Sequence, residues 1–97
     1  MRNYELAYIA DPDLDTQSLK TLEEKVTEQI VALGGKVSKV DRWGKRRLAY
    51  AIRKHNEGFY FIVQFGILAQ ANKELERVLR LNEQIFRFMI SVCESSD

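Results

Sequence analysis

The sequence predicts a single α+β domain in which helices cover one face of an antiparallel sheet. The chain has 97 residues, 45% hydrophobic and 30% charged, which suits one small core and leaves no room for a second domain. Apolar residues recur with the period of strands in four segments and with the helical period in two. The order strand, helix, strand, strand, helix, strand predicts a ferredoxin-like βαββαβ sandwich, with a four-stranded antiparallel sheet and two helices on one face.

The first strand and the first helix follow from apolar spacing. Alternation over Tyr4–Tyr8 predicts a half-buried strand. After a turn at residues 11–13, either Asp13 or Asp15 is available to cap a helix. One helical stripe with spacings of three or four is formed by Leu19, Leu22, Val26, Ile30 and Leu33. Gly34-Gly35 then supplies the left-handed residue that ends this helix.

A long hairpin forms the middle of the chain. Its first strand begins at Lys36 and continues to about Ile52, with an irregularity near Trp43-Gly44. Its second strand covers Phe59–Ile67 and follows the polar turn at residues 54–58. Right-handed crossovers place the first and third strands in the middle of the sheet, so the first hairpin strand lies at an edge.

The second helix and the last strand complete the domain. Helical spacing extends over residues 68–81, and Asn82 is expected to end the helix in a left-handed conformation. Alternation over Phe86–Val92 predicts the final strand, which lies at the other edge. We therefore expect one domain over residues 1–93 and a short acidic tail over residues 94–97.

Alternation also sorts strand residues between a core face and an open face. The expected core set is Tyr4, Leu6, Tyr8, Phe59, Phe61, Val63, Phe65, Phe86, Phe88, Ile90 and Val92. The opposite face mixes charged groups with apolar ones, namely Ile9, Tyr60, Ile62, Ile85 and Met89. Large exposed apolar patches are unusual on monomers, so the open face is expected to be a binding surface.

Basic residues are concentrated in one segment. The net charge is only +1, yet residues 36–54 contain eight lysines or arginines and one aspartate, while both flanking parts of the chain are net acidic. Such local asymmetry favours contact with a polyanion, nucleic acid above all. The alternative is a solvated edge strand whose charges prevent self-association.

The remaining features exclude other classes of protein. Cys93 is the only cysteine, so no intramolecular disulfide is possible, and no signal peptide or membrane span is visible. These observations predict a cytoplasmic protein. No cluster of His and Cys has metal-ligand spacing, and no glycine-rich phosphate loop is present. His55 is isolated in a turn, so we expect no enzyme, no metal, no cofactor and no small-molecule substrate.

The most informative segment is Gly44–Arg53, in which a glycine precedes three consecutive cations and then Leu48-Ala49-Tyr50-Ala51-Ile52. This segment resembles the signature of bacterial ribosomal protein six of the small subunit. The resemblance covers essentially the whole chain, including Met1–Glu5, Asp13-Leu14-Asp15, Gly58-Phe59-Tyr60 and Leu79-Arg80-Leu81-Asn82. Ala51 departs from the proline that many members carry there.

The resemblance implies a ribosome-associated, structural role. Members of the family bind the central domain of small-subunit rRNA together with ribosomal protein eighteen of the small subunit, as a heterodimer. Carried over by position, the residues expected to contact rRNA or the rim of the partner are Arg2, Lys45, Arg46, Arg47, Arg53, Lys54 and Arg87. Aromatic interface candidates are Tyr4, Trp43 and Tyr60, with a core position as the alternative for Tyr4. The alternative function is a ligand-sensing or dimerisation module of the same fold without RNA binding.

Overall fold

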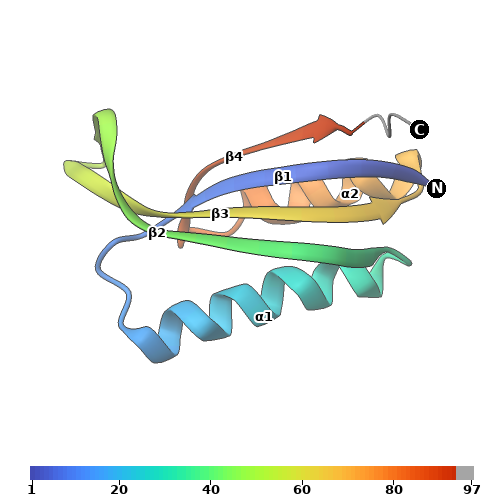
Figure 1. Ribbon diagram of the computed structural model, residues 1–97, viewed down its shortest axis with the longest axis horizontal. Coiled ribbons are helices and arrows are strands. Elements are labelled where there is room, and N and C mark those ends of the chain that lie inside the picture. Colours follow the sequence, from blue (N-terminus) through green and yellow to red (C-terminus); the bar gives the residue numbers. More distant parts are fainter. Residues whose placement is uncertain (94–97) are drawn as a thin grey trace.

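Four antiparallel strands form one sheet in the order β2-β3-β1-β4, and both helices pack on the same face of it (Figure 1). This computed structural model describes residues 1–93, and the expected acidic tail lies outside the described residues. The elements are β1 (Arg2–Ala10), α1 (Thr16–Ala32), β2 (Lys36–Ile52), β3 (His55–Ile67), α2 (Ala69–Arg80) and β4 (Ile85–Val92). The predicted βαββαβ order is confirmed, as are the edge positions of β2 and β4.

Helix α1 begins and ends as its sequence predicts. The Asp15 carboxylate accepts a hydrogen bond of 2.7 Å from the Ser18 backbone N–H, which makes Asp15 the N-cap. That hydrogen bond lowers the pKa of Asp15 from its ordinary value of 3.8. At the other end Gly34 has a φ of +87°, a conformation that only glycine adopts without strain. The chain therefore turns directly into β2.

Helix α2 ends differently from the expectation. Leu81 closes the helix in a right-handed conformation, and Asn82 has no positive φ, so the predicted left-handed terminator is wrong. The Asn82 side chain instead accepts a hydrogen bond of 2.9 Å from the Gln84 N–H. An asparagine after a helix stabilises either conformation, and here its local side-chain bond replaces the left-handed one.

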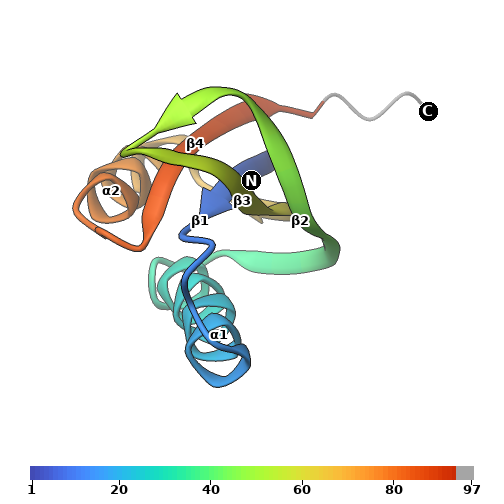
Figure 2. The same ribbon diagram turned by 90° about the vertical axis from the view of Figure 1, so that its left-hand side faces the viewer.

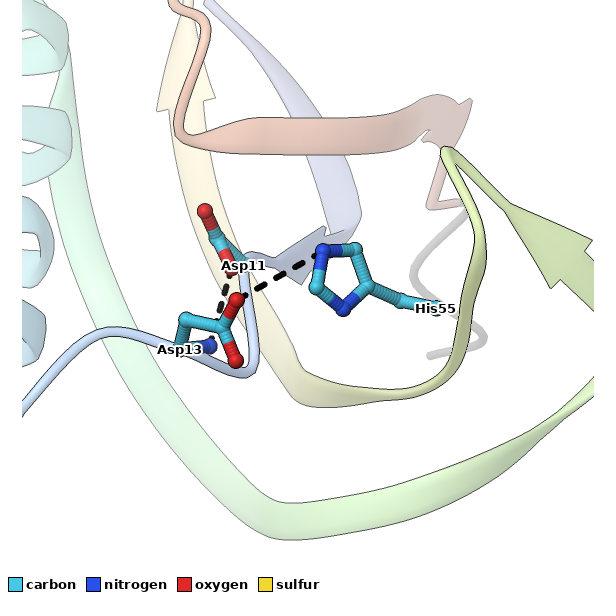
Figure 3. A group of neighbouring side chains, drawn as sticks. All are labelled: Asp11, Asp13 and His55. Carbon is cyan, nitrogen blue, oxygen red and sulfur yellow. Dashed lines mark hydrogen bonds and ion pairs between the residues drawn. The ribbon is translucent and has the colours of Figure 1, made fainter.

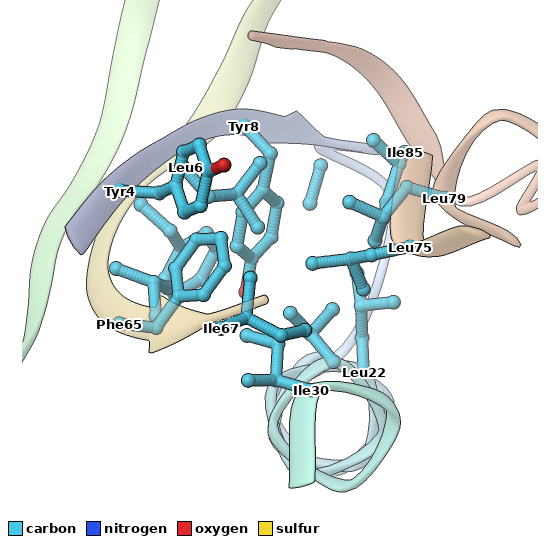
Figure 4. Packing of buried hydrophobic residues seen from close by; sticks show 14 residues of the cluster. Tyr4, Leu6, Tyr8, Leu22, Ile30, Phe65, Ile67, Leu75, Leu79 and Ile85 are labelled. Carbon is cyan, nitrogen blue, oxygen red and sulfur yellow. The ribbon is translucent and has the colours of Figure 1, made fainter. Parts of the chain in front are cut away.

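The core lies between the sheet and the two helices (Figure 4). Tyr4 stacks on Phe65 with ring centroids 5.7 Å apart, and Tyr8 stacks on Phe61 at 4.9 Å. Burial raises the pKa of the Tyr8 hydroxyl. Tyr4 is only 5% exposed, so it occupies the core position that was the alternative to a place at an interface.

Strand β4 contains a bulge that changes which side chains reach the core. Ala10 pairs with Ile85 whereas Ile9 pairs with Arg87, so Phe86 is an extra residue without a partner on β1. Ile85 is consequently buried, although alternation places it on the open face, and Phe86 is only half-buried. Beyond the bulge, Phe88 and Ile90 pack against the core as expected, while Val92 is 51% exposed.

The hairpin turn is tighter than the sequence predicts. Ile52 pairs with His55, leaving only Arg53 and Lys54 in the turn, with φ values of 49° and 68°. Two-residue hairpin turns of this kind require positive φ at both positions, which Asn and Gly favour. Arg-Lys lacks that signal, and the sequence instead predicts a longer turn with β3 beginning at Phe59. The extra length of β3 extends the hairpin beyond the rest of the sheet.

Candidate nucleic-acid interface

The basic cluster, defined here as Lys45, Arg46 and Arg47, follows a bulge in β2. Arg42 pairs with Phe61 and Gly44 with Tyr60, so Trp43 is the extra residue, and Gly44 has a φ of +78°. The bulge bends the edge strand away from the plane of the sheet. The three cations of the cluster therefore stand on a projecting arm rather than along a flat edge.

All three side chains of the basic cluster are exposed, and two of them are held in place. The Lys45 ammonium lies 5.2 Å from the centroid of the Phe59 ring. The Arg46 Nε donates a hydrogen bond of 3.0 Å to the Trp43 carbonyl oxygen, and its guanidinium lies 5.7 Å from the Trp43 ring centroid. Trp43 is itself 52% exposed. The cluster thus presents cations and an exposed indole together.

The tip of the hairpin crosses over the open face of the sheet (Figure 2). Leu48, Tyr50 and Ile52 face Ile9 and Tyr60 across a small groove of about 200 Å³. The apolar side chains after the basic cluster therefore cover part of the open face. Exposed apolar surface on this side is reduced but not removed.

Two of the predicted arginines fix the hairpin tip. Arg87 of β4 donates a hydrogen bond of 3.1 Å from Nη1 to the Tyr50 hydroxyl and stacks on that ring at 5.2 Å. Arg53 donates a bond of 2.9 Å from Nη1 to the Glu83 carbonyl oxygen and lies 5.0 Å from the centroid of Phe86. Lys54 is exposed beside it in the turn. The structure therefore brings Arg53, Lys54 and Arg87 together at the tip.

Arg2 is separate from this group. It pairs with Ile67 at the end of β3, whereas the hairpin turn is at the start of β3, so Arg2 lies at the opposite end of the sheet (Figure 1). It is exposed but shares no surface with the hairpin tip.

The sequence predicts that His55 is isolated in a turn, but in the structure it contacts other side chains. Its Nε2 lies 3.6 Å from the Asp13 carboxylate (Figure 3). Its ring centroid lies 5.4 Å from that of Phe86. With Asp11 these groups place three possible metal ligands within 4.8 Å of one another. Asp11 already accepts a bond of 2.9 Å from the Asp13 N–H, and the Asp13 side chain is 75% exposed. In the structure the group fastens the hairpin turn to the loop between β1 and α1.

An apolar groove of about 370 Å³ remains on the open face beside the hairpin tip. Ala7, Ile9, Tyr60 and Met89 line it, with Arg87 at its side. Met89 is 65% exposed. The groove joins an apolar surface to the cations of the hairpin tip, as expected for a face that binds a partner.

Comparison with known proteins identifies the family. A family model described as Ribosomal protein S6 matches residues 3–91. The chain belongs to the ribosomal protein S6 family. The S6 relative from Moorella thermoacetica, named Small ribosomal subunit protein bS6, is 42% identical over 97% of this chain and 96% of its own length. The protein of the same name from Clostridioides difficile is 45% identical over 95% of this chain and 99% of its own length.

A solved structure has the same fold. The crystal structure of 30S ribosomal protein S6 from Thermotoga maritima superposes with a TM-score of 0.90 at 34% identity, covering 95% of this chain and 87% of that one. As an S6 family member the chain is a structural constituent of the small ribosomal subunit, associated with ribosomes in the cytoplasm, and not an enzyme. No helix within residues 1–93 is long and apolar enough to cross a membrane.

Sequence reasoning missed the residues that position the cations. Tyr50 was seen only as part of the S6 signature, although it anchors Arg87. Arg80 of α2, which lies 5.9 Å from the centroid of Phe88, belongs to the resemblance at the end of the helix but is not among the predicted site residues. Periodicity offers no signal for either contact, because each joins side chains of two different elements. Only the exposed aromatic residues between cations in the hairpin were a hint.

Proposed function

We propose that the chain binds the central domain of small-subunit rRNA through its hairpin and does so jointly with ribosomal protein eighteen of the small subunit. The observation that carries the proposal is the basic cluster on the bulged, projecting arm of β2. Its cations are exposed and no acidic side chain within the described residues is within ion-pair distance of them. Phosphate oxygens are the natural partners of such a group.

The arrangement favours contact with the RNA backbone over reading of bases. Arg46 is stacked on Trp43 and bonded to its carbonyl oxygen, which fixes one edge of the guanidinium and leaves the other available. The core-facing aromatic residues Phe61 and Phe65 of the central strand β3 are not available for stacking, since they are 2% and 1% exposed. Phosphate contacts position a protein on RNA without specifying sequence. Specificity in this proposal comes from the shape of the rRNA and from the partner protein.

The open-face groove supports the partnership. Tyr60 and Met89 provide apolar area there, and Arg87 provides a charged rim close to the hairpin tip. Interfaces are typically built from an apolar centre with aromatic and methionine side chains and a polar rim. A protein seated in this groove would lie next to the basic cluster, so both could contact one RNA site.

The test is the salt dependence of binding to a central-domain rRNA fragment. Each neutralised phosphate contributes about −0.7 to −0.9 to the slope of log affinity against log salt. The double variant Arg46→Ala, Arg47→Ala is expected to make the slope shallower by about 1.5 and to weaken binding about thirtyfold at 0.1 M salt. The matched control is Lys20→Ala, Lys25→Ala on α1, which removes the same charge from the far side and should change the slope little.

Equal slopes for the two double variants would contradict the role of the hairpin. For the partnership, Met89→Glu should abolish formation of the heterodimer with ribosomal protein eighteen in sedimentation experiments, because it places a charge in the apolar groove. Self-association of the chain without any response to RNA would favour the dimerisation module instead.

A further inference from the structure

We propose that the free edge of β4 is a strand-addition site for an extended, acidic segment of another protein. The site lies on the edge of the sheet opposite to the basic cluster. The proposal does not depend on rRNA binding by the hairpin. It rests on which residues of β4 point their backbone N–H and C=O groups away from β1, on the composition of this edge and on the charge of the groove beside it.

The alternation of hydrogen bonds between β1 and β4 shows which backbone groups of β4 are unpaired. The Cys93 N–H donates a hydrogen bond of 2.8 Å to the Asn3 carbonyl oxygen across the β1–β4 ladder. In an antiparallel ladder the residues of one strand point their N–H and C=O groups alternately toward and away from the neighbour. Cys93 therefore points its backbone groups toward β1. Val92, which pairs with Tyr4 one position earlier, points both of its backbone groups outward, and so do Ile90 and Phe88. Within residues 1–93 no strand pairs with this edge.

The edge also lacks the features that usually prevent strand addition. From Arg87 to Val92 the pairing with β1 is regular, without a bulge or a proline. Arg87 is the only charged residue of β4, while Met89 and Val92 are 65% and 51% exposed. Natural sheets protect their edges with charges, prolines or bulges, so an edge without them is a template for another strand.

A groove beside this edge indicates the chemistry of the partner. It has a volume of about 500 Å³ and lies between β4 and α2, with Leu79 and Phe88 among its apolar lining. Three arginines and one glutamate line it, which leaves a net charge of +2; they are Arg53, Arg80, Arg87 and Glu76. The guanidinium carbons of Arg80 and Arg53 lie over the rings of Phe88 and Phe86, 5.9 and 5.0 Å from their centroids. Guanidinium groups supported in this way are suited to carboxylates.

The same charges argue against a second copy of this chain. Pairing of β4 with β4 would bring the arginines of two copies to one edge, where like charges repel. An acidic strand instead gains main-chain hydrogen bonds from Phe88, Ile90 and Val92 and ion pairs from the arginines. Its side chains would alternate between the groove, near Arg80, and the open face, near Arg87.

The experiment uses the full chain and an acetylated, amidated peptide of alternating glutamate and valine, six residues long. Amide hydrogen exchange by NMR is followed with and without the peptide. In the free chain the amides of Ile90 and Val92 should exchange fast and those of Met89 and Ser91 slowly. Added peptide should slow exchange at Phe88, Ile90 and Val92 alone. Absence of this alternating protection would overturn the proposal.

Two control peptides separate strand addition from other binding. A lysine–valine peptide of the same length should bind at least tenfold more weakly, and equal binding would contradict the acidic partner. A glutamate–valine peptide N-methylated at every residue should lose about tenfold in affinity, since it has no N–H with which to complete the ladder. Full binding of that peptide would exclude strand addition. Slowed exchange that depends on chain concentration without peptide would assign the edge to a second copy and also overturn the proposal.

Variants of the chain test the same point. Val92→Pro removes an outward N–H that no residue of the sheet uses, so the fold should persist while peptide affinity falls about tenfold. Arg80→Gln should weaken binding about threefold at low salt. Arg77→Gln is its control, because Arg77 is paired with Glu74 on α2 and is not part of the groove. Equal effects of the two arginine variants would contradict the assigned site.

Discussion

Strands β2 and β4 both lie at an edge of the sheet, but they differ in the regularity of their pairing and in their charge. β2 interrupts its pairing with β3 between Val37 and Lys39, between Arg42 and Gly44, and after Arg47. It carries the basic cluster on its projecting part. β4 is shorter, pairs regularly beyond its initial bulge and contains a single charge. One edge is irregular and cationic, and the other is regular and largely apolar.

The difference shows how one small sheet separates two kinds of surface. Bulges and cations on β2 prevent another strand from pairing there, and the same cations are then available to a polyanion. On β4 the backbone groups remain accessible because nothing in the strand blocks them. Arg87 connects the two regions, since it belongs to β4 and holds Tyr50 of the hairpin.

The largest expected effect comes from proline placed at neighbouring positions of β4. Ser91 pairs with Glu5, and its N–H points toward β1. Ser91→Pro therefore removes a ladder hydrogen bond and should lower the free energy of unfolding by about 2 kcal/mol. Val92→Pro removes an outward N–H and should cost less than about 1 kcal/mol. Denaturant unfolding of both variants measures the difference. Equal losses would mean that the two residues do not differ in phase, and the contrast between the edges would fail.

Most of the fold could be predicted from local patterns, because its elements are strongly periodic. The α1 stripe, the Asp15 cap and Gly34 each act within a few residues, and the structure confirms them. The error in the expected core set arose where one extra residue shifts a register. Phe86 has the right alternation for the core, but the bulge at Ile9 and Ala10 gives that place to Ile85. Alternation alone does not reveal where a ladder gains a residue.

The second prediction concerns the bulge that protects β2. Gly44 has a φ of +78°, and a Cβ added there would meet no atom within 4 Å. Gly44→Ala should therefore lower the free energy of unfolding by about 1 kcal/mol through backbone strain alone. Gly44→Asn should cost about half as much, because asparagine tolerates the left-handed region. Thermal or denaturant unfolding of the pair measures this, and equal stability of all three chains would contradict a strained bulge.

The candidate site could be predicted only in part. Its charges were evident in the sequence because the basic excess is confined to residues 36–54. How they are oriented was not, since Arg87 and Arg53 are held by Tyr50 and Glu83 across distances of 37 and 30 residues in the chain. The hairpin tip folds over the open face through apolar side chains that look like an ordinary strand. Contacts of this kind depend on the curvature of the whole hairpin, which local periodicity does not encode.

The smallest expected effect concerns the contact that joins the two edges. Tyr50→Phe keeps the ring under Arg87 and removes the hydroxyl that accepts its hydrogen bond, whereas Arg87→Met removes the cation. Tyr50 is 62% exposed, so solvent competes for both groups and the coupling energy in a double-mutant cycle should be about 0.5 kcal/mol. A coupling near zero would mean that the Tyr50–Arg87 contact does not hold the hairpin tip to β4. In that case the basic cluster and the free edge would act as independent surfaces, and peptide on β4 would leave RNA binding unchanged. A measurable coupling instead predicts that a strand added to β4, by engaging Arg87, loosens the hairpin tip slightly.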